Sequence, residues 1–178
     1  MIREPTLDDA AEIGAAHAAI AKATYPGIAD RAKLEALNAE SLALRWERIV
    51  RSFGEQAARG VFTRCAIDAA TGRVAGFATG GAARDEDAPA ETELWSLNVI
   101  PEHHGRGVAE QLMAAVIPPD ENAYLWVARG TIGRSPSTAS TGLNSMAVPG
   151  SIRNGDVTRS GWLRTRFVVA VLAELSRV

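Results

Sequence analysis

A short loop, EHHGRG at residues 102–107, holds the residues best suited to chemistry. It follows an apolar run typical of a strand, and the residues after it have apolar positions at helical spacing. A glycine-bearing loop that opens a helix brings main-chain N–H groups and the positive end of the helix dipole to one point, which attracts phosphate. Gly105 and Gly107 let an anion approach without a Cβ in the way, and Arg106 adds a positive charge. The same spacing also fits a plain glycine-rich connection, so this segment alone leaves both interpretations open.

Two common phosphate-binding loops are absent from the sequence. No segment matches the pattern GxxxxGK[ST]. The dinucleotide pattern GxGxxG begins at Gly105, but Glu110 occupies its third glycine position, where a carboxylate repels a pyrophosphate. Kinase-like and NAD-dependent functions are therefore excluded.

Hydrophobic spacing predicts the elements that position this loop. Apolar residues at helical spacing predict helices, and alternating or continuous apolar runs bounded by turn residues predict strands. The strand before the loop, the helix after it and a further strand form a βαβ unit. The predicted order is helix 6–22, helix 40–58, a hairpin of strands 61–67 and 73–79, strand 93–100, helix 108–117 and strand 124–127.

Other polar or aromatic residues in these elements favour structural roles. His17 shares the apolar face of the first helix with Ile13, which favours a packed core histidine over a catalytic one. Trp46 lies on the apolar face of the second helix, which favours core packing. The charged residues 84–87 belong to the loop 80–92 and are typical of a solvated loop, although loops also hold substrate contacts.

The loop and the strand before it resemble the GNAT superfamily of acyl-CoA-dependent N-acyltransferases. The characteristic motif of that superfamily is an apolar strand, then Val-x-Pro, then [QR]-x-x-G-x-[GA] at the start of a helix. Here the segment reads LWSLNVIPEHHGRGVAEQLM, in which Val99 and Pro101 lie close to the usual places. Gly107 and Ala109 match the glycine and small-residue positions, and His104 stands where members usually have Gln or Arg.

The element order of residues 1–130 is also similar to that of the superfamily, and the resemblance implies a fold and a reaction. The fold is α/β (α+β), with a mixed, mostly antiparallel sheet flanked by helices. The reaction is direct attack of a primary amine, on a small molecule or a protein, on the thioester of acetyl-CoA, without a covalent enzyme intermediate. The implied coenzyme-binding residues are Leu97, Asn98 and Val99, through main-chain hydrogen bonds to the pantetheine arm, and His104, Gly105, Arg106, Gly107, Val108 and Ala109, through N–H groups to the pyrophosphate.

Glu93 is the candidate catalytic base. An ammonium group with a pKa near ~10 must lose a proton before it attacks, so a base is needed within hydrogen-bond reach or at the end of a water chain. Glu93 stands fourteen positions before Gly107, where many members of the superfamily carry a catalytic glutamate. Plain alternation places Glu93 on the side of Leu97. The direction of the Glu93 carboxylate therefore depends on the β-bulge that members of the superfamily have in this strand. A solvent-facing glutamate at the strand end is the alternative interpretation.

Length and composition bound the remaining possibilities. The chain of 178 residues, 47% hydrophobic and 22% charged, is typical of one folded domain. A net charge of −2 without a Lys/Arg run disfavours nucleic acid as a partner. The acidic start and the lack of an apolar stretch of about 18 residues predict no signal peptide and no membrane span, and hence a cytoplasmic protein. The single cysteine, Cys65, excludes an internal disulfide and a CxxC site, and no metal is expected.

Residues 131–178 depart from the superfamily. They contain twelve Ser or Thr, six Arg, no Lys and two acidic residues, so their net charge is +4, while residues 1–130 carry −6. Members of the superfamily continue with N-x-x-A-x-x-F-Y-x-K-x-G-F, which supplies a helix against the coenzyme and often a tyrosine acid; this segment is missing. We therefore divide the chain into a core, 1–130, and an atypical tail, 131–178, in which residues 133–160 are expected to be irregular. A one-base deletion near codon 130 is a hypothesis that explains the change.

Two other functions stay open at this point. One is a protein that binds coenzyme A but is catalytically impaired, because it lacks the acid and the last strands. The other is a structural or interaction domain in which the glycine-rich loop is only a connector. The oligomeric state also stays open, and because members of the superfamily often dimerise, a homodimer is one alternative.

Overall fold

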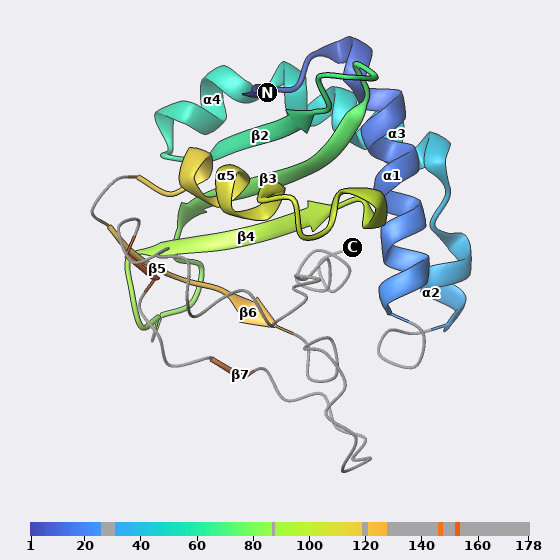
Figure 1. Cartoon of the computed structure of the whole chain (residues 1–178). Coiled ribbons are helices and arrows are strands. Elements are labelled where there is room, and N and C mark those ends of the chain that lie inside the picture. Colours follow the sequence, from blue (N-terminus) through green and yellow to red (C-terminus); the bar gives the residue numbers. More distant parts are fainter. Residues whose placement is uncertain (26–30, 87, 119–120, 128–145, 148–151, 154–178) are drawn as a thin grey trace.

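One mostly antiparallel sheet with helices on both faces forms the centre of the protein (Figure 1). The structure is a computed structural model that describes residues 1–25, 31–86, 88–118, 121–127, 146–147 and 152–153. The strand order is β1-β2-β3-β4-β5-β8, and every neighbouring pair is antiparallel except β4 and β5, which are parallel. The strands are β1 (Ile2–Arg3), β2 (Phe62–Ile67), β3 (Val74–Ala82), β4 (Thr92–Val99), β5 (Asn122–Tyr124) and β8 (Ile152–Arg153). The predicted fold class is confirmed.

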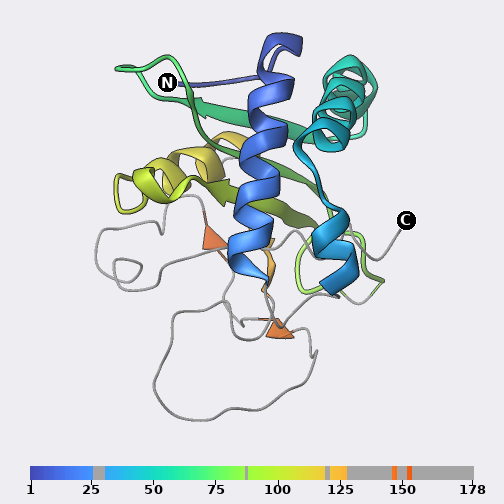
Figure 2. The same ribbon diagram turned by 90° about the vertical axis from the view of Figure 1, so that its right-hand side faces the viewer.

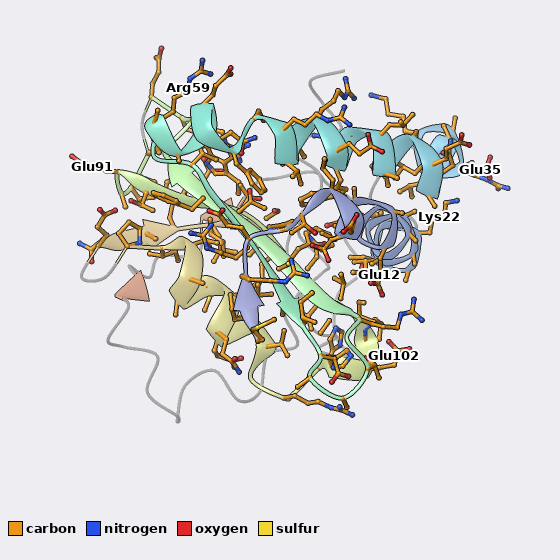
Figure 3. The ribbon with its side chains drawn as sticks, turned by 90° about the horizontal axis from the view of Figure 1, so that it is seen from above. Glu12, Lys22, Glu35, Arg59, Glu91 and Glu102 are labelled. Carbon is orange, nitrogen blue, oxygen red and sulfur yellow. The ribbon has the colours of Figure 1, made fainter. Side chains whose placement is uncertain are left out.

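The helices divide between the two faces of the sheet. They are α1 (Ala10–Thr24), α2 (Arg31–Ala36), α3 (Ala39–Arg51), α4 (Phe53–Ala58) and α5 (Val108–Val116), with short 3-10 helices η1 (Leu7–Asp9) and η2 (Pro101–His103). Helices α1 and α3 pack side by side (Figure 2), and α3 and α5 lie on opposite sides of the strands (Figure 3). The core on the α5 side includes Leu97 and Leu112, and the core on the α1 and α3 side includes Phe77 and Trp46.

The helix expected over residues 40–58 is in fact two helices, α3 and α4. Its start is fixed by Asn38, whose Oδ1 accepts a hydrogen bond from the Ser41 N–H at 2.7 Å. The chain bends at Ser52, where the side-chain hydroxyl donates to the Ile49 carbonyl at 2.9 Å. A serine that hydrogen-bonds to the preceding turn competes with the helical pattern, which explains the break. Strand β1 and helix α2 were not predicted from the apolar spacing.

Two short strands lie in the C-terminal tail. Strand β7 (Met146–Ala147) pairs antiparallel with β6 (Trp126–Val127), and β8 pairs antiparallel with β5. The rest of the segment expected to be irregular, 133–160, and the expected boundary at residue 130 lie outside the described residues. In the part of the chain that the structure describes, no helix has both the length and the apolar composition needed to cross a membrane.

Candidate functional site

Strand β4 contains a bulge that changes the direction of its side chains. In the register with β3, Ser96 is opposite Thr79 and Leu94 is opposite Gly80, so Trp95 is an extra residue on β4. One extra residue shifts every side chain beyond it to the other face relative to plain alternation. The two ends of β4 therefore follow different alternation patterns.

The bulge places Glu93 and Asn98 on the same face of the sheet. Asn98 is the register partner of Phe77, which belongs to the core on the α1 and α3 side. Leu97 belongs to the core against α5 and so points the other way. Ser96 lies on the face of Asn98, two residues away. Glu93 therefore lies on the face opposite Leu97, as the bulge expected in this strand requires.

The edge of β4 that faces β5 is open over most of its length. The parallel pairing with β5 is limited to two register pairs, at Thr92 and Glu93. Among the described residues, 94–99 have no strand partner on this edge. Sheet edges of this kind present unpaired main-chain N–H and C=O groups. The ring Nε2 of His104 lies 2.9 Å from the carbonyl oxygen of Val99, at the end of the open stretch.

The loop between β4 and α5 presents main-chain N–H groups at the start of the helix. Gly105 and Gly107 have φ angles of 72° and 76°, in the left-handed region that favours glycine. Within the described chain, no N–H group of residues 105–109 donates to a main-chain carbonyl. A Cβ at Gly105 meets nothing within 4 Å, and a Cβ at Gly107 meets only Nε2 of Gln111, at 3.8 Å. The loop therefore has the geometry of an anion site at a helix N-terminus.

Charges of both signs lie around this loop. Arg106 is exposed. Nε2 of His103 lies 3.7 Å from Oδ2 of Asp68, which belongs to the turn between β2 and β3. The hydrogen bond from the Ala70 N–H is the main reason why the pKa of Asp68 is lowered, and the charges of His103 and Arg106 act in the same direction. The turn between β2 and β3 thus contributes a negative charge beside the positive charges of the loop.

Glu93 is buried, with 2% of its side chain exposed, and its carboxylate accepts four hydrogen bonds. Arg84 donates three of them: Nη2 to Oε1 at 2.5 Å, Nε to Oε2 at 3.0 Å and the main-chain N–H to Oε2 at 3.2 Å. The hydroxyl of Tyr124, on β5, donates the fourth to Oε2 at 3.3 Å. Among the described residues, Oε1 accepts one hydrogen bond, which leaves it an acceptor position without a partner in this part of the chain. The interpretation of Glu93 as a solvent-facing glutamate is wrong.

The groups that hold Glu93 are themselves fixed. The guanidinium carbon of Arg84 lies 4.8 Å from the centroid of the Trp95 ring, a cation–π contact. Burial, together with the charges of Glu93 and Asp85, raises the pKa of Tyr124 to about 12. The phenol is therefore protonated at neutral pH and acts as a hydrogen-bond donor.

Arg84 and Tyr124 are neighbours of Glu93 that the sequence did not reveal. The charged residues 84–87 were expected to be typical of a solvated loop, but Arg84 is 21% exposed and pairs with a buried carboxylate. A signal was available in the hairpin. Gly81 on β3 is the register partner of Glu93 on β4. The residues just after Gly81 therefore lie near Glu93, and a basic side chain among them can reach its carboxylate.

A family model described as the Acetyltransferase (GNAT) family matches residues 26–125, which is more than half of the chain. The chain belongs to the GNAT acetyltransferase family. Among solved structures, this GNAT chain is similar to the PaiA N-acetyltransferase of Thermoplasma acidophilum in complex with coenzyme A, with 16% identity over 74% of this chain and 80% of that chain and a TM-score of 0.52. It is also similar to the ribosomal-protein-alanine N-acetyltransferase of Brucella melitensis, with 19% identity over 73% of this chain and 75% of that chain and a TM-score of 0.49. At such identities the likeness to PaiA shows the shared fold. No curated protein matches the chain.

In this GNAT acetyltransferase the site residues expected from the sequence occupy one strand and the loop after it. Residues 97–99 lie on the open edge of β4, and residues 104–109 lie at the start of α5. Glu93 lies at the other end of β4, beyond the bulge. Figure 3 shows Glu91 and Glu102, which flank β4 in sequence, at opposite ends of the sheet. The structure thus makes the edge and the loop continuous, with Glu93 near the beginning of the same edge.

Proposed function

We propose that the chain transfers the acetyl group of acetyl-CoA to a primary amine. The observation that carries the proposal is the continuity of two backbone surfaces that have no main-chain partner among the described residues, the edge of β4 at residues 94–99 and the N–H groups at residues 105–109. An extended molecule with amide groups matches a free strand edge, and a diphosphate matches a helix N-terminus. Coenzyme A joins an amide-containing arm to a pyrophosphate and so matches both surfaces.

The residues of the loop and the edge have separate roles in this proposal. Main-chain groups of residues 97–99 hydrogen-bond the pantetheine arm, and N–H groups of residues 104–109 bind the pyrophosphate. Gly105 and Gly107 keep the approach free of side-chain atoms, because a Cβ at either position would occupy space that is otherwise open. The exposed guanidinium of Arg106 adds charge that attracts the phosphates.

Acetyl transfer forms one C–N bond and breaks one C–S bond. It also needs two proton transfers, one from the amine and one to the thiolate. The lone pair of the neutral amine forms a C–N bond with the thioester carbonyl carbon, and the C–S bond breaks as the sulfur leaves as a thiolate that then takes a proton. The amine must lose a proton to a base. Glu93 accepts it at the open position of Oε1, directly or through water, while Arg84 and Tyr124 hold the carboxylate in place.

A second candidate function is a coenzyme-binding protein with impaired catalysis. The observation that favours it is the occupancy of the Glu93 carboxylate, which accepts four hydrogen bonds, three of them from Arg84. A general base needs a lone pair that reaches the proton it removes, and donors already bound to the carboxylate compete for its lone pairs. Binding and transfer therefore need separate tests.

Titration calorimetry with acetyl-CoA tests the binding site. Gly107→Asp places a carboxylate at the loop and Gly107→Asn a neutral group of the same size, and both residue types tolerate a positive φ. We expect Gly107→Asp to bind at least about tenfold more weakly than Gly107→Asn, or about 1.4 kcal/mol. Gly54→Asp, at an exposed position of α4 where a Cβ meets nothing within 4 Å, is the control and should bind normally. Equal affinities of the two Gly107 variants contradict the proposed phosphate site.

A thiol-release assay over a panel of primary amines tests transfer. Glu93→Gln should lower kcat/KM by about 10²–10⁴, the usual contribution of a general base, while the affinity for acetyl-CoA stays unchanged. Binding without thiol release by the unaltered chain supports the impaired protein instead. If the unaltered chain binds no acetyl-CoA, both candidate functions fail and an interaction domain remains.

A further inference from the structure

The side chain of His104 contacts the strand edge along which coenzyme A is proposed to lie. Its ring Nε2 is 2.9 Å from the main-chain carbonyl oxygen of Val99, the last residue of β4. A carbonyl oxygen can only accept a hydrogen bond, so Nε2 carries a proton and donates it. His104 also stands where members of the GNAT superfamily usually have Gln or Arg. The contact is therefore made by a residue that departs from the family motif.

The hydrogen bonds of the sheet show which way the Val99 carbonyl points. The main-chain N–H of the next residue, Ile100, donates to the carbonyl of Ala75 on β3 at 3.0 Å. In an antiparallel pair, the main-chain groups of successive residues point alternately towards the partner strand and away from it. Those of Val99 therefore point away from β3, to the edge that has no strand partner among the described residues. The main-chain groups of Leu97, two residues earlier, point the same way.

A short turn brings the imidazole back to this edge. The 3-10 helix η2 begins two residues after Val99, and the N–H of His103 donates to the Ile100 carbonyl at 2.9 Å. The next residue is His104, whose side chain is exposed. Its ring therefore covers the end of the open edge that leads into the loop at residues 105–109. Because water can replace either partner of an exposed hydrogen bond, the ring can leave the carbonyl at a small cost in free energy.

We propose that His104 competes with the pantetheine arm of coenzyme A for the Val99 carbonyl. The inference rests on the proposed binding of the coenzyme along residues 97–99 and adds a residue that sets its affinity. An amide N–H of the arm must come within about 3 Å of the oxygen to which His104 donates in the free protein, so the imidazole leaves when the arm binds. A nucleotide that has the diphosphate but no arm occupies only the loop and leaves His104 in place. His104 therefore weakens the binding of the coenzyme but not of the armless nucleotide.

Titration calorimetry with two matched ligands tests this competition. Coenzyme A contains the arm, and 3′-phosphoadenosine 5′-diphosphate is the same nucleotide without it. Neither ligand has an acetyl group, so binding is measured without turnover. We expect His104→Ala to bind coenzyme A at least about threefold more tightly than the unaltered chain, which is the size of effect that one exposed hydrogen bond produces. The two proteins should bind the armless nucleotide with affinities that agree within about 1.5-fold.

His103→Ala is the matched control. It also removes one imidazole beside the loop, but Nε2 of His103 lies 3.7 Å from Oδ2 of Asp68 and not on the strand edge. A changed charge near the phosphates should alter the binding of both ligands by the same factor, so the ratio of the two affinities should equal that of the unaltered chain.

Three results of the calorimetry overturn the proposal. If His104→Ala binds coenzyme A as the unaltered chain does, the Val99 carbonyl accepts both donors without competition. If it binds coenzyme A more weakly, the ring contributes a favourable contact with the coenzyme. If it binds both ligands more tightly by the same factor, the effect of His104 lies at the phosphates and not at the arm.

Crystal structures with and without coenzyme A give a second measurement. The imidazole of His104 should lie on the Val99 carbonyl in the free protein and away from it in the complex, and a ring that keeps this contact in the complex overturns the proposal. If neither ligand binds to the unaltered chain or to His104→Ala, the coenzyme site and the competition fail together. If both ligands bind as expected but no amine releases thiol from acetyl-CoA, the transferase function fails and the role of His104 stands.

Discussion

The ion pair between Arg84 and Glu93 shows how one residue can be both a candidate for catalysis and part of the fold. Glu93 is 2% exposed and Arg84 21%, so the pair is largely withdrawn from water. Charges in such a place are tolerated only when they are paired and hydrogen-bonded, as they are here. The same contacts that fix the carboxylate also limit its freedom to act as a base. Arg84 therefore favours stability by pairing with the buried Glu93 carboxylate, and the same contacts act against catalysis by that carboxylate.

Removing one partner of this pair should be more harmful than removing both. We expect Arg84→Met to lower the free energy of unfolding by about 2–4 kcal/mol, because it leaves a buried carboxylate unpaired. The double variant Arg84→Met/Glu93→Gln should recover at least about 1 kcal/mol of the summed losses. Urea unfolding measures all four proteins. Arg51→Met is the control, since its pair with Glu47 is exposed and should contribute less than about 1 kcal/mol. An additive double variant would show that the pair is not coupled.

Asp9 makes the start of the chain sensitive to acid. Its carboxylate accepts hydrogen bonds from Arg3 at 2.6 and 2.8 Å and from the main-chain N–H of Thr6 at 2.6 Å. Chiefly through Arg3, these bonds lower the pKa of Asp9 from 3.8 to about 2. Between these two values the unfolded chain binds more protons at Asp9 than the folded chain does, so stability falls as the pH falls.

We therefore expect the stability that Asp9 provides to be present above pH 4 and to disappear towards pH 2. At neutral pH, Asp9→Asn should unfold with about 1–2 kcal/mol less free energy than the unaltered chain, a value reduced for partial exposure to solvent. The difference between the two proteins should vanish near pH 2, because other carboxylates contribute equally to both. Urea unfolding over this pH range measures it. A difference that is constant with pH contradicts the assignment to the Asp9 carboxylate.

The elements differ in how far local sequence determines them. The apolar spacing identifies α1, α5, the hairpin of β2 and β3, and β4, because each of these buries one face or both faces against the core. The break at Ser52 and the bulge at Trp95 depend on single hydrogen bonds and on the register with a neighbouring strand, which periodicity does not show. The two-residue strand β1 is too short to have a pattern at all.

The packing of α1 against α3 depends on one glycine. A Cβ at Gly14 lies 2.5 Å from the main-chain nitrogen of Ala43, so the two helices approach each other backbone to backbone. We expect Gly14→Ala to lower the free energy of unfolding by about 1–3 kcal/mol, because α1 and α3 must move apart. Gly54→Ala, in α4, is the matched control: its Cβ meets nothing within 4 Å, and alanine should add about 0.5–1 kcal/mol. A stabilised Gly14→Ala protein, measured by urea unfolding, contradicts the close packing.

The candidate site has one part that local sequence predicts and another part that it does not. The glycine loop and the strand before it are contiguous, so the strand–loop–helix order of residues 97–109 could be predicted from local sequence, and their binding of coenzyme A stays a prediction. The contacts of Glu93 with Arg84 and Tyr124 depend on the pairing of β4 with both neighbouring strands, which no local pattern encodes. Likewise, the side-chain atoms of Asn98 and His17 that have no hydrogen-bond partner among the described residues become visible only when α1 is packed on the sheet.

The family match ends at residue 125, close to the change of composition after residue 130. We propose that a one-base deletion near codon 130 changed the reading frame there. When the last base of each codon is joined to the first two bases of the next, synonymous codons for residues 130–147 permit NDRAIAFYRKHGFELDG, which contains the missing family segment without a gap. Thr138, for example, supplies the bases AC after the last base of Ser137, which permits tyrosine. A random frame would not be expected to follow the motif through so many positions.

The nucleotide sequence decides this hypothesis, and the restored protein tests its physical consequence. Codons 130–147 read in the shifted frame should encode the helix segment; a different shifted reading disproves the deletion. Adding one base near codon 130 should also restore several buried apolar side chains, each worth roughly 1.5–3 kcal/mol, against a total domain stability of about 5–15 kcal/mol. We expect the thermal midpoint to rise by at least about 5 °C, since each kcal/mol shifts the midpoint of a domain of this size by about 2–4 °C. An unchanged midpoint would mean that residues 131–178 stabilise the core as well as the family segment does.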